Sequence, residues 1–147
     1  MSLKNFMVLV LSVSLVIGVV LTGGCVRDET VNQETPAQII EDVTAQEAFT
    51  LIQNNQDDPG FVIIDVRTPE EFAEGHIEKA VNIDFRSETF RDEVDNLDKN
   101  KTYLIYCRSG RRSADALNIM RELNFMKIYH MAGGMIEWTA EELPTVK

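Results

Sequence analysis

From residue 43 to the C-terminus, short apolar runs alternate with segments of helical periodicity, and this alternation constrains the fold more than any other feature. The apolar runs are continuous, which is typical of strands buried on both faces. Predicted strands cover residues 61–64, 80–83, 102–106 and 127–130. A first predicted helix begins after residue 44, and others cover residues 68–75, 87–94, 113–123 and 135–142. Strands that alternate with helices predict an α/β domain with a central parallel sheet and helices on both faces.

Two of these helices begin with a capping box, in which a Thr hydroxyl and a Glu three residues later satisfy free backbone N–H groups. The pairs are Thr44 with Glu47 and Thr68 with Glu71. Pro at the first helical position, residue 69, strengthens the second assignment. Arg67 lies four residues before Glu71, so we expect an ion pair between these two side chains.

The N-terminus is a separate apolar segment. Residues 5–26 carry no charge, and residues 6–21 are apolar apart from two Ser and one Gly. Lys4 before this run and small residues after it follow the plan of a secretory signal, and the run is shorter than the roughly 20 residues of a full membrane span. The ending LTGGC resembles a lipoprotein signal, in which Cys25 is acylated and becomes the first mature residue.

An uncleaved membrane anchor and plain secretion are the alternatives to a lipoprotein. All three place the remainder of the chain outside the cytoplasm, and we expect an exported protein anchored on the extracytoplasmic side of a membrane. The predicted organisation is a signal peptide or anchor over residues 1–24, a polar tether over 25–42 and a single domain over 43–147.

The charge balance narrows the range of partners. The chain has 14 Lys and Arg against 24 Asp and Glu, a formal net charge of −10. Nucleic acid is bound through clustered cations that neutralise phosphates. We therefore expect no nucleic-acid partner.

One Cys lies where this architecture places chemistry. Cys107 directly follows the predicted strand 102–106, and ligands of open α/β sheets bind beyond the carboxyl ends of the strands. The next five residues include three Arg and Gly110, and a helix is predicted to start at Ser113. Inward-facing loop N–H groups, a helix N-terminus and guanidinium groups all favour a thiolate, which is the reactive form of Cys. The alternative is a buried, inert Cys, but a loop so rich in Arg is not a core composition.

Three segments now carry a specific resemblance. They are DVRTPEEFAEGHIEKAVNI at residues 65–83, CRSGRRS at 107–113 and MAGGMIEW at 131–138. In this order and at these separations they resemble a single-domain rhodanese, a sulfurtransferase of rhodanese-like α/β fold. The similarity spans residues 43–143.

The resemblance implies a mechanism. Cys107 would take a sulfane sulfur from a small donor such as thiosulfate to form a persulfide, and would pass it to a thiol or to cyanide. The loop amides would cradle the persulfide; the loop residues are Arg108, Ser109, Gly110, Arg111 and Arg112. No metal and no organic cofactor is implied, because the Cys itself carries the sulfur.

Loop length separates this family from relatives of similar topology. Phosphatases and arsenate reductases use C-x5-R, which would require an Arg at position 113, where this chain has Ser. Arg112 instead closes the six-residue loop associated with sulfur transfer. We expect Arg108 and Arg112 to act on the bound anion and Arg111 to face solvent.

Other candidate residues are expected to support the site. In the resembled family the motif that contains Asp65 and Arg67 mainly supports the active loop, and His76 suits a hydrogen-bonded packing role better than that of a general base. His130 has no partner motif, and two distant His without a second Cys make a metal site improbable. Further along the chain we expect a turn and then a core anchor, formed by Gly133, Gly134 and Trp138.

Two functions from different classes remain. The first is an exported, membrane-tethered sulfurtransferase that turns over through Cys107. The second is a non-catalytic rhodanese-like module on the membrane surface that holds or relays sulfur for a partner. The natural donor and acceptor, the type of envelope and the oligomeric state do not follow from the sequence.

Overall fold

The computed structural model describes residues 37–147, and within them the chain forms a five-stranded, entirely parallel sheet. The strands lie in the order β1-β5-β4-β2-β3. Their bounds are Ile39–Val43 (β1), Phe61–Asp65 (β2), Val81–Asn82 (β3), Thr102–Tyr106 (β4) and Lys127–Met131 (β5). The predicted α/β class with a central parallel sheet is confirmed.

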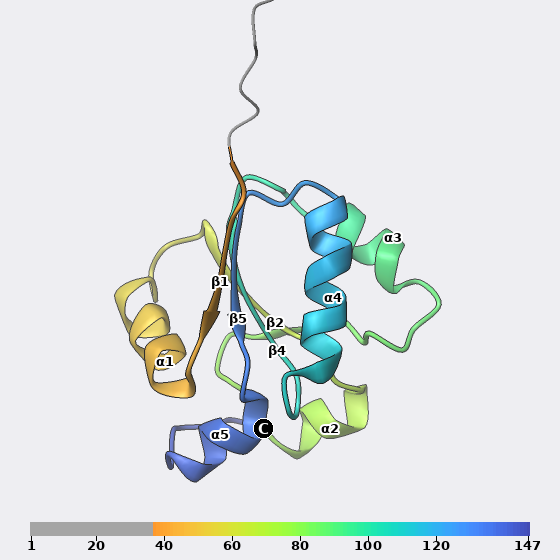
Figure 1. Ribbon diagram of the computed structural model, residues 1–147. Coiled ribbons are helices and arrows are strands. Elements are labelled where there is room, and N and C mark those ends of the chain that lie inside the picture. Colours follow the sequence, from red (N-terminus) through yellow and green to blue (C-terminus); the bar gives the residue numbers. More distant parts are fainter. Residues whose placement is uncertain (1–36) are drawn as a thin grey trace, which may run out of the picture. The chain divides into compact units, whose positions relative to one another are not determined.

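Within residues 37–147, five helices connect and cover the strands (Figure 1). Their bounds are Ala45–Asn54 (α1), Pro69–Glu74 (α2), Phe90–Asp95 (α3), Arg111–Glu122 (α4) and Gly134–Ala140 (α5). Helices α1 and α4 lie on opposite sides of the sheet in Figure 1, and α3 lies on the side of α4. The carboxyl ends of the strands point toward α2 and α5.

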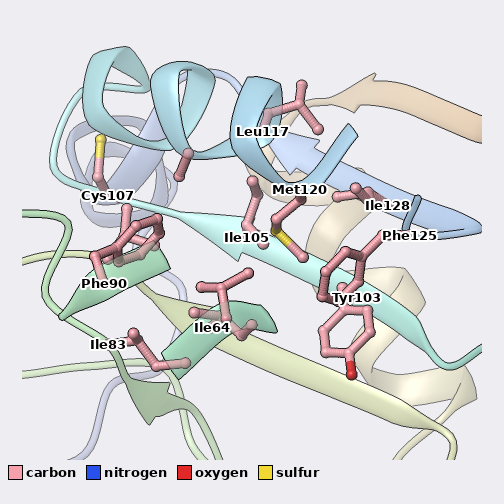
Figure 2. Close-up of a cluster of buried hydrophobic side chains, with 13 residues drawn as sticks. Ile64, Ile83, Phe90, Tyr103, Ile105, Cys107, Leu117, Met120, Phe125 and Ile128 are labelled. Atoms are coloured by element: carbon pink, nitrogen blue, oxygen red, sulfur yellow. The ribbon is translucent and has the colours of Figure 1, made fainter. Parts of the chain in front are cut away.

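Each face of the sheet buries its own apolar cluster. One cluster joins alternate strand residues to α3 and α4; its largest members include Ile64, Tyr103, Ile105, Phe125 and Ile128 (Figure 2). The other joins the remaining strand residues to α1 and α5, including Leu104, Tyr106, Met131 and Trp138. Two buried faces explain why the central strands are continuous apolar runs.

Strand β1 differs from the sequence prediction. Residues 39–42 belong to the predicted polar tether, but in the structure they pair in parallel with β5, from Ile39 opposite Lys127 to Val43 opposite Met131. The strand is at the edge of the sheet and only Val43 is fully buried. An edge strand with Glu41 and Asp42 lacks the apolar run that reveals the central strands.

Several element boundaries differ by a few residues. Strand β3 is shorter than predicted, and α4 begins two residues earlier, at Arg111. Helix α3 begins at Phe90 and not at Ser87, because Ser87 and Thr89 form a turn in which the Ser87 hydroxyl accepts from the Thr89 N–H. Such hydroxyl turns compete locally with the helix.

Both predicted capping boxes are confirmed. The Thr44 and Thr68 side chains accept hydrogen bonds from the N–H groups of Glu47 and Glu71, and each Glu side chain accepts from its capping Thr. The box at Thr68 fixes the start of α2 directly after β2, close to the carboxyl edge of the sheet.

The predictions for the N-terminus, including the signal or anchor and the acylation of Cys25, lie outside the residues that the structure describes. Over residues 37–147, none of the helices has the length and apolar character that crossing a membrane requires.

Candidate active site

Cys107 stands at the carboxyl edge of the central strand β4, and α4 begins four residues later. Figure 2 shows its side chain at one end of the buried cluster, beside the first turn of α4. The residue is 1% exposed. The chain therefore brings a nearly buried sulfur to the edge where α/β proteins bind ligands.

Hydrogen-bond donors surround this sulfur. Burial raises the pKa of the Cys107 thiol, but the Ser113 hydroxyl and the backbone N–H groups of Ser113, Ser109 and Arg112 lower it, and the net pKa is below the ordinary value. The Ser113 Oγ lies 3.5 Å from the sulfur. The predicted loop amides thus favour a thiolate through hydrogen bonds, with an additional side-chain donor from the helix.

Gly110 gives the loop its curvature. It precedes α4 with φ of 82°, a left-handed conformation that favours glycine. A Cβ at this position would lie 1.8 Å from the carbonyl oxygen of Ala132. Both the backbone conformation and the close approach of the residue after β5 therefore require Gly here.

The start of α5 also lies against the loop and forms hydrogen bonds with it. The N–H groups of Met135 and Ile136 donate to the carbonyl oxygens of Cys107 and Arg108, at 2.9 and 3.0 Å. These two hydrogen bonds hold the backbone of the loop against the start of α5. Gly134 allows the contact, since its φ is 58° and a Cβ would lie 2.5 Å from the Cys107 oxygen. The sequence indicated only a turn at this Gly.

Arg112 is fixed by an acid that is distant in sequence. Its guanidinium donates to both oxygens of Glu71, at 2.7 and 2.8 Å. The Arg112 guanidinium is the main reason that the pKa of Glu71 falls to about 2. The expected pair between Arg67 and Glu71 is wrong, because Arg67 turns instead to Asp65.

Asp65 and Arg67 form a buried ion pair beneath the loop. The Arg67 Nη2 lies 2.7 Å from Asp65 Oδ2 and also donates to the Gly75 carbonyl. Its guanidinium lies 5.9 Å from the ring centre of Tyr106, the residue before Cys107. These contacts link the turn after β2 to the end of β4, and the supporting role of Asp65 and Arg67 stays a prediction.

His76 lies in the packing of α2 against the C-terminal segment. Its ring stacks on Phe72 with 3.7 Å between centroids, and Nδ1 is 3.0 Å from the Phe72 carbonyl oxygen. Its backbone exchanges hydrogen bonds with Val146. Trp138 is buried and donates to the Pro144 carbonyl, as expected of a core anchor.

His130 does have a partner that sequence reasoning missed. Its Nε2 lies 2.9 Å from Ser113 Oγ, and its Nδ1 lies 2.8 Å from Asp42 Oδ1. Asp42 belongs to the unpredicted strand β1, so no sequence pattern linked the two residues. The structure places these three side chains in a row that ends at Cys107.

An open hollow of about 730 Å³ lies outside the loop. Four Arg and two acids line it, so Arg is in excess; the lining is Thr68, Glu71, Phe85, Arg86, Arg108, Ser109, Arg111, Arg112 and Asp115. Arg86 follows β3 and is absent from the site that the sequence predicted. The concentration of guanidinium groups makes this hollow suitable for a small anion.

No group of three or more His, Cys, Asp or Glu side chains is arranged to hold a metal ion within residues 37–147. The chemistry that these residues can support is that of an activated thiolate beside a cationic hollow.

Comparisons with known proteins show which proteins this chain is similar to. A family model described as "Rhodanese-like domain" matches residues 44–141. The chain is 40% identical over 87 residues to YtwF of Bacillus subtilis, whose name assigns it provisionally as a sulfurtransferase; the match covers 59% of this chain and 82% of that protein. It is 33% identical over 119 residues to a tRNA uridine(34) hydroxylase of Sodalis glossinidius, covering 77% of this chain but 31% of the relative.

A solved structure gives the same fold. The crystal structure of a rhodanese-related protein from Thermoplasma volcanium superposes with a TM-score of 0.60 at 26% sequence identity. The match covers 72% of this chain and 97% of that chain.

Proposed function

The chain belongs to the rhodanese-like domain family, and from this premise we propose that it is a sulfurtransferase that moves a sulfane sulfur from a donor such as thiosulfate to a thiophilic acceptor through a persulfide on Cys107. The observation that carries the proposal is the position of the Cys107 sulfur beside the Ser113 hydroxyl and the backbone N–H groups of Ser109, Arg112 and Ser113. The provisional name of the Bacillus subtilis relative supports the same class of reaction.

The reaction has two steps. The Cys107 thiolate attacks the outer sulfur of thiosulfate, a new S–S bond forms, and the S–S bond of thiosulfate breaks with its electron pair leaving on sulfite. Cyanide or a thiolate then attacks the outer sulfur of the persulfide, and the electron pair of the broken bond returns to Cys107. With cyanide the product is thiocyanate, and the enzyme thiolate is regenerated.

The loop can stabilise the negative charge that moves from the Cys107 sulfur to the outer sulfur of the persulfide. The persulfide carries its negative charge on the outer sulfur, one bond further from Cys107 than the starting thiolate. Backbone N–H groups that converge on one point stabilise an anion without reorganisation. The guanidinium of Arg112 is held at the rim by Glu71, which balances its charge but fixes its remaining N–H donors in place.

The Arg side chains around the hollow outside the loop are evidence that the sulfur donor is a small anion. Arg86, Arg108 and Arg111 line it beside Arg112, within a chain whose net charge is −10. This local positive charge would attract thiosulfate and stabilise departing sulfite. The overall negative charge argues against a nucleic-acid partner. The cycle needs no metal or organic cofactor, since Cys107 carries the sulfur.

A non-catalytic module that holds sulfur for a partner is the alternative. A thiosulfate:cyanide assay distinguishes the two, because a sulfurtransferase forms thiocyanate over many turnovers. A holding module forms at most one equivalent. Cys107→Ser is the matched control and should abolish both the turnover and the single equivalent. If the unmodified chain takes up sulfur but forms no more than one equivalent of thiocyanate, the holding module is favoured.

We extend the proposal to location on the basis of the N-terminal sequence alone. Residues 1–24 act as a lipoprotein signal or membrane anchor, and Cys25 is the acylated residue, so that the domain works on the extracytoplasmic side of a membrane. Cys25→Ser should release or misprocess the protein in membrane fractionation. A wild-type chain that fractionates as a soluble protein would contradict this part of the proposal.

A further inference from the structure

A row of hydrogen-bonding side chains runs from the surface of the sheet edge to the Cys107 sulfur. Asp42 on β1 is the outer member, and its side chain is 72% exposed. His130 on β5 is next, with a side chain that is 6% exposed, and Ser113 in the first turn of α4 is fully buried. The successive distances are 2.8 Å, 2.9 Å and 3.5 Å, the last from Ser113 Oγ to Cys107 Sγ.

The carboxylate of Asp42 determines which ring nitrogen of His130 carries a proton. An ionised carboxylate only accepts hydrogen bonds, so His130 Nδ1 must carry the proton that points at Asp42. A neutral His130 then has a lone pair on Nε2, and Ser113 donates its hydroxyl proton to that nitrogen. A doubly protonated His130 donates from Nε2 instead, which frees the Ser113 hydroxyl proton for the sulfur.

The carbonyl oxygen of Gly110 lies within hydrogen-bond distance of both His130 and Ser113. It accepts the Ser113 hydroxyl at 3.0 Å and lies 3.2 Å from His130 Nε2. A carbonyl oxygen can accept the Nε2–H of an imidazolium but offers nothing to an unprotonated nitrogen. Together with the Asp42 carboxylate, this oxygen gives the imidazolium an acceptor at each ring nitrogen.

We propose that Asp42, His130 and Ser113 form a proton relay that takes the proton of the Cys107 thiol and holds it on His130. The thiol proton passes to Ser113 Oγ while the Ser113 hydroxyl proton passes to His130 Nε2. The products are a Cys107 thiolate that accepts a hydrogen bond from Ser113, and an imidazolium paired with Asp42. Protons and charges balance, because a neutral pair becomes an anion and a cation.

This inference rests on the proposed function and deepens it, since it concerns how the nucleophilic thiolate forms. Ser113 and His130 are positioning residues, because they act on the sulfur and not on the substrate. The Ser113 hydroxyl, which ends the row, is one of the groups that lower the pKa of Cys107.

Other charged groups near β5 face elsewhere. Helix α1 packs against the opposite face of the sheet, where Tyr129 points, so Glu47 lies away from the imidazole. On α4 the charged side chains of the first turns, Arg111, Arg112 and Asp115, line the open hollow. Within residues 37–147, Asp42 is the acid that lies within ion-pair distance of His130.

The test is the pH dependence of iodoacetamide alkylation of the full chain, read on the peptide that carries Cys107. His130→Gln keeps a polar side chain but cannot hold the proton, so the midpoint of alkylation should rise by about one pH unit, or roughly tenfold less thiolate below both midpoints. Asp42→Asn should raise the midpoint of alkylation by less than His130→Gln does. The matched controls Glu41→Gln and Tyr129→Phe, one residue away on each strand, should leave it unchanged.

A double-mutant cycle separates a relay from two independent effects. Ser113→Ala interrupts the row, so adding His130→Gln to it should produce no further shift. Thermal unfolding identifies any variant that has lost its fold. Additive shifts, or an unchanged midpoint in folded His130→Gln, would overturn the relay.

A measurement on the unmodified side chains of the relay stays informative if a variant fails to fold. The ¹⁵N chemical shifts of the His130 ring, recorded at one pH before and after alkylation of Cys107, should differ, because alkylation removes the group that supplies the proton. Identical chemical shifts would overturn the relay. Neither experiment uses a sulfur donor, so failure of the proposed function would be recognised separately, as a wild-type chain that forms no persulfide.

Discussion

The guanidinium of Arg112 donates to both carboxylate oxygens of Glu71, at 2.7 and 2.8 Å, across 41 residues of sequence. This bidentate pair joins the start of α4 to the start of α2, so the last residue of the Cys loop is fixed by the motif that follows β2. Planar bidentate geometry orders a guanidinium more than a single contact does. Arg112 is therefore a preorganised charge, whereas Arg111 on the same turn is exposed.

The first prediction compares these two neighbours. Arg112→Ala should lower kcat/KM for sulfur transfer by roughly tenfold or more, equivalent to about 1.4 kcal/mol of transition-state stabilisation. Arg111→Ala should have a clearly smaller effect. Steady-state thiocyanate formation measures both. Equal losses would mean that the fixed charge of Arg112 has no special role.

The second prediction concerns acid stability. The pKa of Glu71 is lowered to about 2, chiefly by its hydrogen bonds with Arg112. A carboxyl whose pKa is depressed on folding stabilises the protein above its unfolded pKa, and this contribution is lost as pH falls toward the folded pKa. Glu71→Gln should therefore lower the free energy of unfolding at neutral pH, by about 1 kcal/mol after allowing for solvent screening.

Denaturant titrations at several pH values provide the measurement. The difference between wild type and Glu71→Gln should be constant above about pH 5.5 and should shrink between about pH 4.5 and pH 2. A difference that is independent of pH would contradict the assignment of this stability to the ionised pair.

The third prediction concerns the loop backbone. Gly110→Ala places a Cβ 1.8 Å from the Ala132 carbonyl oxygen at a φ of 82°, so the loop must move. We expect destabilisation of about 2 kcal/mol or more and loss of most sulfur transfer. Gly60→Ala is the control, because its Cβ would meet only the movable Asp58 side chain, at 3.0 Å. Comparable behaviour of the two variants would mean that the curvature of the loop at Gly110 is not required for stability or for sulfur transfer.

The central strands, the capping boxes and the Cys loop could be predicted because each leaves a local pattern. Phe61 to Ile64 is a continuous apolar run, and Cys107 and its Arg-rich loop directly follow another. Strand β1 has no such pattern, since its residues Glu41 and Asp42 are as polar as a tether and are held by pairing with β5.

Contacts between distant segments could not be predicted for a related reason. Glu71 pairs with Arg112 and not with the nearer Arg67, because the fold turns Arg67 toward Asp65. The Asp42–His130 contact spans 88 residues and requires β1 to lie beside β5. Sequence spacing carries information about neighbours along one helix, but not about which strands become adjacent.

The fourth prediction concerns the reactivity of the thiol. The pKa of Cys107 is lowered because hydrogen bonds from Ser113 and the loop N–H groups outweigh burial. Alkylation of Cys107 should therefore have a midpoint below that of a free Cys, about 8.5. The rate against pH, read on the peptide that contains Cys107, is the measurement. A midpoint at or above the free value would contradict an activated thiol.

The mass of the full chain after incubation with thiosulfate tests the central claim most directly. Persulfide chemistry predicts a gain of one sulfur atom on the peptide that contains Cys107, its removal by cyanide with release of thiocyanate, and neither event in Cys107→Ser. A Cys107 that reacts with iodoacetamide but gains no sulfur from thiosulfate, or a gain that persists in Cys107→Ser, would contradict the account.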